Sequence, residues 1–329
     1  MIQSSRRSRQ PVREAWSRDK LLRERAIALG QAIDTSTLKS YSSALNSYLA
    51  FVRLHDFPVE PTPDTLSFYT VFMCSFLKPE SVTGYLSGLC QQLEPYFPNV
   101  RAARLSPLVE RTLKGCKRLK GVATKRKRAL TFTDLQLVSN ALQNSPLHDD
   151  RLFLSMLYTG FFALMRLGEL SFPDDIDLRN WRKVTKRSTV ILTDDQYEFL
   201  LPGNKSDPFF EGNRIIVKKD QYCNLDPLSF FRSYLISRDS NFPLSSPLWL
   251  TSKGRVPTRY FFMSRMRRFF DKDVGGHSMR AGGATSLAEH GVPTSLIQLI
   301  GLWSLDAFLI YIRKSPVLIQ ALLYATKHP

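Results

Sequence analysis

Hydrophobic residues between residue 14 and about residue 120 recur at intervals of three and four, the spacing of one face of an α-helix. The clearest stripe follows Asp34 and Thr35, either of which can cap a helix. Its members are Leu38, Tyr41, Leu45, Tyr48, Leu49 and Val52. Residues 55–58, HDFP, end this helix. Proline suits the first turn of a helix, so further helices are predicted to start near Pro63, near Pro79 and after Ser106. This pattern predicts a bundle of four or five helices.

The pattern changes in residues 120–130, KGVATKRKRAL, which have no hydrophobic periodicity and are six-elevenths Lys, Arg or Gly. This composition is typical of a linker. The next segment, TFTDLQLVSNAL, predicts a helix capped by Thr131 or Thr133, and LFLSMLYTGFFALM predicts a buried helix after it. Short β-branched runs at 188–192 and 214–217 predict strands around a polar middle, and the chain after Pro227 is expected to be helical to its end. The fold predicted is mainly α with a small β insertion.

The chain of 329 residues carries a net charge of +17, which favours a polyanionic partner. Residues 1–130 hold 22 Lys and Arg against 10 Asp and Glu, a net charge of +12, and the remainder holds 24 against 19, a net charge of +5. No apolar run approaches the roughly 20 residues of a membrane-spanning helix, so an acidic membrane surface is the weaker alternative. We expect a disordered basic tail over 1–13, a helical domain over 14–119, the linker over 120–130 and a second domain over 131–329.

Four cysteines, Cys74, Cys90, Cys116 and Cys223, lie far apart without a C-x-x-C pair. They match no zinc or disulfide framework and are typical of a reducing compartment inside the cell. The run Lys125, Arg126, Lys127 and Arg128 can serve as a nuclear import signal, as a strap on DNA phosphates, or simply as a solvated linker. We therefore expect a soluble nuclear protein that binds DNA through these four residues.

Four short patterns carry residues suited to phosphate chemistry. Arg166 follows an apolar run, where a guanidinium needs an anion or a carboxylate, and Glu169 lies within one helical turn of it. His277 and Arg280 share a helix face at spacing i, i+3, where one titrates near neutral pH and the other binds phosphate oxygens. The others are Lys205 at a β-turn, LPGNKSDP, and the C-terminal stretch with Trp303 and Tyr311. Taken singly, each is as well explained by ordinary packing or ion pairing.

The order of these patterns resembles the tyrosine recombinase (phage integrase) superfamily: Arg-x-x-Glu, a Lys in the β region, His-x-x-Arg, then Gly-x-Trp and Tyr. The phrase GHSMRAGGATSLAEHGVPTSLIQLIGLWSLDAFLIYIR is similar to the recombinases of eukaryotic Crypton-type and DIRS-type mobile elements. The resemblance covers about residues 130–325. The N-terminal bundle is similar in kind to that family's core-binding domain.

The resemblance implies a DNA strand-transferase that needs no metal or cofactor. Tyr311 would attack the scissile phosphate to form a 3′-phosphotyrosyl bond, and Arg166 and Arg280 would stabilise the charge of the transition state. His277 would move a proton and Lys205 would protonate the leaving 5′-oxygen. Trp303 would donate its indole N–H to the phosphate, and Glu169 would orient the first arginine.

The resemblance also implies the assembly on DNA. The core-binding and catalytic domains are expected to form a C-shaped clamp around double-stranded DNA. Recombination implies a homotetramer on paired sites, assembled from a protein that is a monomer or dimer when free.

Alternatives remain within and beside this assignment. The interval from Trp303 to Tyr311 is eight residues, one shorter than the family's commonest spacing, and Tyr324 is the alternative nucleophile. Other lysines border the same β region: Lys183, Lys186, Lys218 and Lys219. A type IB topoisomerase and a domesticated recombinase that only binds DNA are the neighbouring functions. A metal-dependent nuclease would need acidic residues, and the candidate pairs are Asp149 with Asp150, Asp174 with Asp175, and Asp194 with Asp195.

Overall fold

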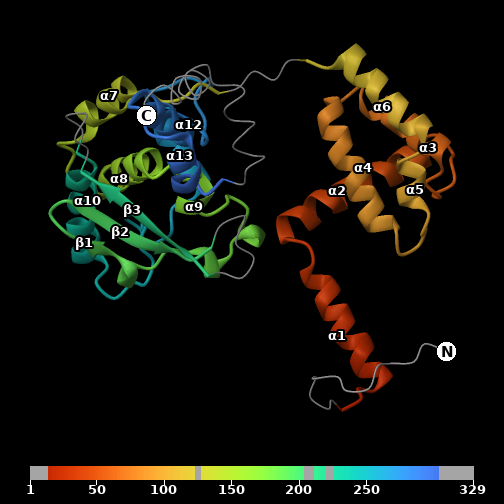
Figure 1. The fold of residues 1–329 in the computed structure, drawn as a ribbon, viewed down its shortest axis with the longest axis horizontal. Helices are drawn as coiled ribbons and strands as arrows, with labels where there is room; N and C mark the ends of the chain where they lie inside the picture. Colours follow the sequence, from red (N-terminus) through yellow and green to blue (C-terminus); the bar gives the residue numbers. More distant parts are fainter. Residues whose placement is uncertain (1–13, 123–126, 204–210, 220–225, 304–329) are drawn as a thin grey trace, which may run out of the picture. The chain divides into compact units, whose positions relative to one another are not determined.

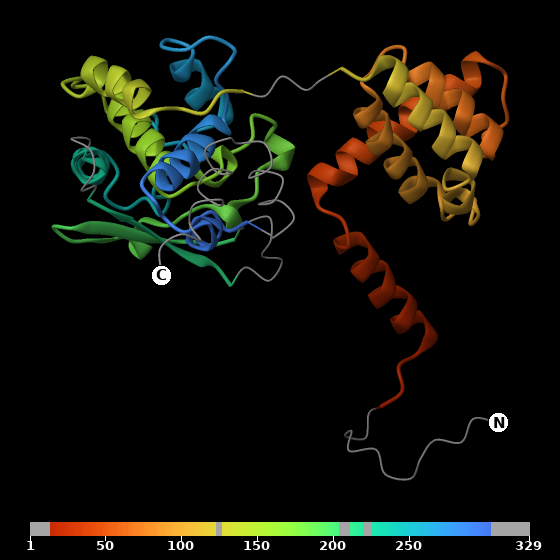
Figure 2. The same ribbon diagram turned by 45° about the horizontal axis from the view of Figure 1, so that its top comes forward.

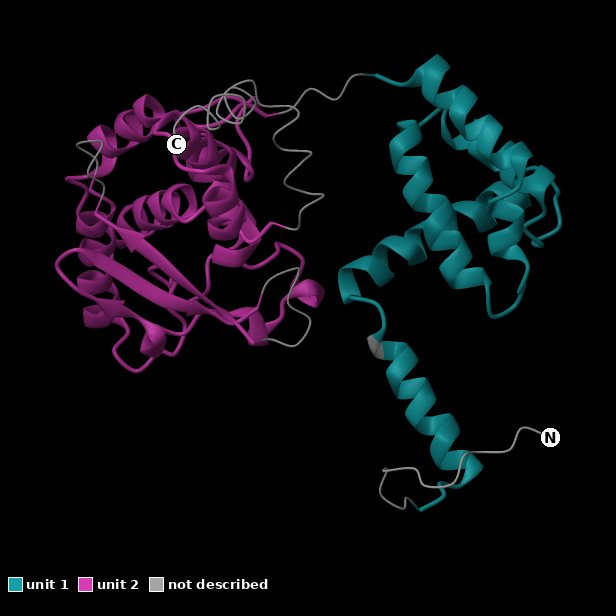
Figure 3. Cartoon of the chain, in the orientation of Figure 1, with its two compact units in different colours: residues 1–124 teal, residues 125–329 magenta. Residues whose placement is uncertain are grey.

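The computed structural model describes residues 14–122, 127–203, 211–219 and 226–303. The chain forms two compact units, Met1–Thr124 and Lys125–Pro329 (Figure 3). Their boundary falls within the basic segment 120–130. None of the helices in the described ranges is long and apolar enough to cross a membrane.

The first unit is wholly helical over its described residues. Its helices are α1 Arg18–Gln31, α2 Thr35–Leu54, α3 Pro63–Met73, α4 Pro79–Leu93, α5 Val100–Arg104 and α6 Pro107–Lys120 (Figure 1). Asp34 caps α2 through its carboxylate, and proline occupies the first turn of α3, α4 and α6, as the sequence predicts. The core takes its side chains from α2 to α6, whereas α1 is exposed along its length.

The second unit contains seven α-helices and three strands within its described residues. The helices are α7 Phe132–Leu142, α8 His148–Phe162, α9 Leu167–Leu170, α10 Pro227–Asn241, α11 Arg259–Met266, α12 Ser278–Glu289 and α13 Thr294–Ile300. Thr131 is the cap of α7, where Asp134 completes a capping box. The strands β1 Ile191–Leu192, β2 Gln196–Leu201 and β3 Asn213–Lys218 form one antiparallel sheet in that order. The predicted fold class, mainly α with a small sheet, is confirmed.

The sheet differs in detail from its prediction. The first expected strand, 188–192, is a 3-10 turn at Arg187–Thr189 followed by the two residues of β1. The longer β2 lies in the segment interpreted as a polar middle. Its buried residues Tyr197, Phe199 and Leu201 alternate with half-buried ones. The sequence signal for this strand is therefore a hydrophobic residue at every second position.

The region after Pro227, predicted to be helical, is helical only in part over its described residues. Residues 242–258 and 267–277 are irregular segments that separate α10, α11 and α12. Residues 304–329, the remainder of that prediction, lie outside the described residues, as does the tail 1–13.

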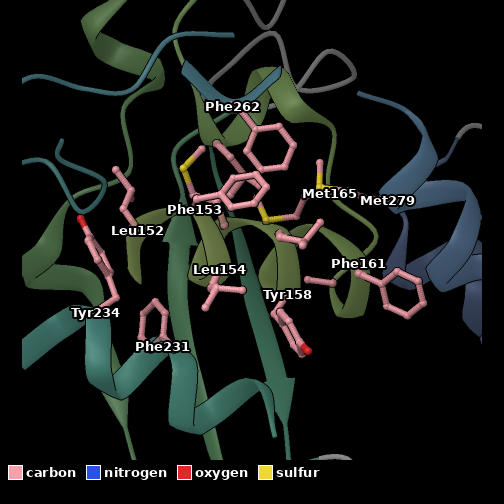
Figure 4. Packing of buried hydrophobic residues seen from close by; sticks show 14 of the residues in the cluster. Leu152, Phe153, Leu154, Tyr158, Phe161, Met165, Phe231, Tyr234, Phe262 and Met279 are labelled. Atoms are coloured by element: carbon pink, nitrogen blue, oxygen red, sulfur yellow. The ribbon is translucent and has the colours of Figure 1, made fainter. Parts of the chain in front are cut away.

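Helix α8 is the centre of the second core and is almost entirely buried. Figures 1 and 2 both place it in the middle of the unit, among α7, α10 and α12. Side chains of α8 pack against Phe231 and Tyr234 of α10, against Phe262 of α11 and against Met279 of α12 (Figure 4). Because α8 ends just before Arg166 and α12 begins just after His277, this packing sets where the predicted site residues meet.

Candidate active site

Arg166 lies directly after the turn that ends α8 and caps the short helix α9. The Met165 N–H returns to the Gly160 carbonyl at 3.0 Å, which closes the turn. Glu169 accepts both the backbone N–H of Arg166 and a guanidinium N–H, each at 2.7 Å. The carboxylate side chain is only 10% exposed and the Arg166 side chain 25%. Glu169 therefore fixes the direction of a guanidinium that still reaches solvent.

Helix α12 carries the predicted His-x-x-Arg pair on its first turn, with His277 at its N-cap and Arg280 within it. Two glycines let α12 approach its neighbours closely. A Cβ atom at Gly282 would overlap the Leu130 carbonyl, and one at Gly283 would overlap the Phe161 carbonyl, both well inside the 3.0 Å limit of real Cβ contacts. The small residues that the sequence shows at this point thus bring the start of α12 against the end of α8.

Arg280 is the most deeply held of these groups, at 3% exposed. One guanidinium nitrogen donates to the Leu164 carbonyl at 2.8 Å, and another donates to the Gly301 carbonyl. The guanidinium carbon lies 4.3 Å from the centre of the Trp303 ring, a cation–π contact. Trp303, which the resemblance places against the phosphate, thus also supports Arg280 from one face.

The backbone around Arg280 is strained at two points. Leu164 and Leu302 have φ angles of +50° and +49°, a region that a leucine enters at a cost of about 1–3 kcal/mol. Leu164 supplies one of the carbonyls that bind Arg280, and Leu302 directly follows the residue that supplies the other. The strain is therefore located where the chain presents two carbonyls to one guanidinium.

The His277 residue is exposed to solvent, unlike the buried Arg280. Partial burial lowers its pKa below the ordinary value of 6.5, and the positive charges of Arg280, Arg259 and Arg166 lower it further. The imidazole is therefore neutral at pH 7 and can accept a proton. The same electrostatic coupling brings in Arg259, the first residue of α11, which the sequence prediction missed. No sequence signal marks it, because only the tertiary fold brings α11 to His277.

Several predicted residues are not placed. The nucleophile Tyr311, the alternative Tyr324, the proton donor Lys205 and the linker residues Lys125 and Arg126 lie outside the described residues. The alternative lysines are described: Lys183, Lys186, Lys218 and Lys219. None of these four is among the charged groups that shift the pKa of His277.

Residues 127–130, the end of the linker segment, are bonded to the rest of the second unit. Arg128 pairs with Asp134 at 2.5 Å and with Asp273 at 2.8 Å, and Asp134 makes the main contribution to raising its pKa. Lys127 donates to the Lys272 carbonyl. The roles of these two side chains as DNA contacts stay a prediction, and within the protein both act as anchors.

The acidic pairs have structural partners. Asp149 accepts the Ser252 N–H at 2.7 Å and pairs with Arg265, while Asp150 accepts the Ser145 hydroxyl. Asp174 accepts the Tyr260 N–H, Asp175 caps a 3-10 turn at Ile176–Leu178, and Asp194 pairs with Arg232. Within the described ranges, no group of three His, Cys, Asp or Glu side chains is arranged to hold a metal ion.

No family model matches the sequence, and no curated protein sequence matches it. Solved structures do. The XerH site-specific recombinase bound to palindromic difH substrate matches 88% of this chain and 80% of its own, with a TM-score of 0.61 at 16% identity. The Tn1549 transposon integrase in complex with transposon right end DNA matches 94% and 97%, with a TM-score of 0.60 at 14% identity. The lambda integrase (residues 75–356) bound to DNA matches 94% and 98%, with a TM-score of 0.55 at 14% identity.

The chain has the tyrosine recombinase fold. Within that fold, Arg166, His277 and Arg280 are drawn together by the packing of α8 against α12 and are linked through the pKa of His277. The geometry suits binding of a phosphate: two guanidiniums, one neutral imidazole and a carboxylate that orients one of the arginines. Trp303 and the carbonyls of Leu164 and Gly301 hold the second arginine in place.

Proposed function

We propose that this protein is a site-specific tyrosine recombinase that cuts and rejoins DNA strands through Tyr311. The observation that carries the proposal is the convergence of Arg166, His277 and Arg280 in a tyrosine recombinase fold. Arg166 lies more than a hundred residues before the His277 and Arg280 pair, and a shared anionic ligand explains why a folded protein would hold the two guanidiniums close to one imidazole.

The proposed reaction exchanges one phosphodiester for another. The Tyr311 oxygen bonds to the scissile phosphorus as the bond to the 5′-oxygen breaks, so a 3′-phosphotyrosyl ester conserves the energy of the original bond. Neutral His277 accepts the phenol proton, and Lys205 protonates the departing 5′-oxygen. Arg166 and Arg280 stabilise the extra negative charge of the transition state, so the proposal assigns no metal or cofactor. Rejoining runs the steps in reverse with a 5′-hydroxyl as the nucleophile.

The substrate in this proposal is double-stranded DNA, which a chain of net charge +17 is suited to bind. The protein would assemble as a homotetramer on paired sites from a monomer or dimer. The resemblance of residues 276–313 to Crypton-type and DIRS-type enzymes supports an origin in a mobile element. The basic run 125–128 supports action in the nucleus.

Covalent capture tests the chemistry without knowledge of the target. The protein is incubated, in EDTA, with a library of nicked duplexes of randomised sequence, and DNA that survives denaturing extraction is sequenced. A nick beside the cleaved phosphate lets the short 5′-hydroxyl fragment diffuse away, which traps the intermediate. We expect an adduct whose peptide maps to Tyr311, and Tyr311→Phe should give none.

Tyr324→Phe is the matched control and should leave the adduct intact. An adduct at Tyr324 would contradict the assigned nucleophile. DNA binding without any adduct would favour the domesticated DNA-binding function. Strand exchange between two differently labelled duplexes, as opposed to relaxation of a supercoiled plasmid, separates a recombinase from a type IB topoisomerase.

A further inference from the structure

The backbone of Arg259 is tied to the same stretch of chain as Arg166. Its N–H donates to the Phe172 carbonyl at 2.8 Å, and the Phe172 N–H donates to the Pro257 carbonyl at 2.8 Å. These two bonds form a short parallel bridge between the segment that follows α9 and the start of α11. Thr258 caps α11 by accepting the Phe261 N–H at 3.2 Å. The Cα of Arg259 is therefore fixed relative to Arg166.

The Arg259 side chain folds over the segment that leads into α12. A Cβ atom built on Gly276 would lie 3.3 Å from a terminal guanidinium nitrogen of Arg259, so the guanidinium covers the residue just before His277. Its charge lowers the pKa of His277 more than that of Arg166 does. The guanidinium is therefore directed toward the phosphate-binding group.

The positive charge of Arg259 is uncompensated within the described part of the chain. Arg166 has Glu169 and Arg280 has two carbonyls, but no ion pair or hydrogen bond of these described residues reaches the Arg259 guanidinium. The carboxylate of Asp174, which contacts the start of α11, accepts the Tyr260 N–H at 2.7 Å. Three guanidiniums thus act on His277, and that of Arg259 has no partner among the described residues, an arrangement that an added anion stabilises.

The three arginines differ in depth. Arg280 is 3% exposed, the Arg166 side chain is 25% exposed, and Arg259 lies among the exposed residues. A scissile phosphodiester carries one negative charge and two non-bridging oxygens, and Arg166 and Arg280 suffice for both. The guanidinium of Arg259, the most exposed of the three, is therefore available to the neighbouring phosphodiester of the same strand.

We propose that Arg259 binds the phosphodiester adjacent to the scissile one on the cleaved strand and so fixes the register of that strand in the site. This inference rests on the proposed function for the position of the scissile phosphate. Arg166 and Arg280 would then hold the scissile phosphate, and Arg259 would hold its neighbour.

A phosphate-neutralisation map tests the proposal. A duplex selected for binding from a random library is resynthesised with single methylphosphonates, which remove the charge of one phosphate at a time. Affinities are measured with Tyr311→Phe, and then with Arg259→Gln or Arg166→Gln added to it. Arg259→Gln should weaken binding to the unmodified duplex about tenfold, the loss of one charge-assisted contact. In one singly modified duplex, Arg259→Gln should no longer weaken binding, because the phosphate that Arg259 contacts is already neutral. That modified phosphate should be the neighbour of the one at which Arg166→Gln no longer weakens binding.

Arg255→Gln is the matched control, because it removes the same charge four residues earlier from an exposed position that does not act on His277. Arg259→Gln should also reduce the slope of log affinity against log salt by about 0.9, the value for one phosphate contact. An effect of Arg259→Gln that persists at every modified position, or that vanishes at the same phosphate as the Arg166 effect, would overturn the proposal.

Two further readouts separate this inference from the proposed function. NMR of the labelled histidines, with His277→Gln for assignment, should show the pKa of His277 rising in Arg259→Gln without any DNA present. An unchanged pKa would refute the placement of the guanidinium. If the protein with Tyr311 intact forms no covalent adduct while the phosphate map holds, then strand cleavage fails and the Arg259 contact stands.

Discussion

The close approach of α12 to α8 can be tested by adding a single methyl group at Gly283. In an open helix, Gly→Ala stabilises a protein by up to about 1 kcal/mol, because alanine has less backbone freedom to lose. At Gly283 the new Cβ would overlap the Phe161 carbonyl and lie 2.5 Å from a Leu164 methyl carbon. The obstacle is backbone, which cannot rotate away, so α12 must move. Overpacking of this kind costs about 1–3 kcal/mol.

Gly168→Ala is the control for the change in the free energy of unfolding, because Gly168 lies in α9 of the same unit and a Cβ there meets nothing within 4 Å. We expect Gly283→Ala to lower the free energy of unfolding by about 2 kcal/mol relative to Gly168→Ala. Urea unfolding followed by tryptophan fluorescence suits this comparison, because Trp249 is buried in the core of that unit. Equal stabilisation by both substitutions would refute the contact between α12 and α8.

Four further predictions concern the site itself. Trp303→Phe keeps a ring against Arg280 but removes the indole N–H, so a large loss of cleavage rate with an unchanged free energy of unfolding would assign Trp303 to the phosphate. Trp303→Ala also removes the ring, and it should lower both the cleavage rate and the free energy of unfolding. Glu169→Gln should slow single-turnover cleavage more than it weakens DNA binding, because it frees the direction of Arg166 while leaving its charge. Since the pKa of His277 lies below 6.5, the pH at which the cleavage rate falls to half should also lie below 6.5. The free energy of unfolding should also decrease below pH 6.5, because the unfolded chain takes up that proton first, and His277→Gln should lack this component.

Local signals explain which parts of the fold were predictable. Asp34 and Thr131 cap helices because their side chains accept nearby N–H groups, an interaction that needs no distant partner. Strand β2 carried such a signal in the alternation of Tyr197, Phe199 and Leu201, but the polar residues around it concealed the pattern.

The site was predictable only as a set of residues. Arg166, His277 and Arg280 were identified by their order along the chain, but the carbonyls that hold Arg280 were not. A leucine with positive φ runs against its own preference, and only the tertiary contacts of Leu164 make that conformation favourable. Arg259 was missed for the same reason, because its neighbours come from other parts of the sequence.

The end of the linker has a mechanical consequence. The Arg128 N–H donates to the Asp273 carbonyl at 2.8 Å, and the Leu130 N–H donates to the Ser278 carbonyl at 3.0 Å. These two bonds span the segment that contains His277. A pull on the chain that precedes Lys127 would therefore act on this segment, as well as on α7 through the Arg128–Asp134 pair. The start of the second unit is thus bonded on both sides of the residues that lead into α12.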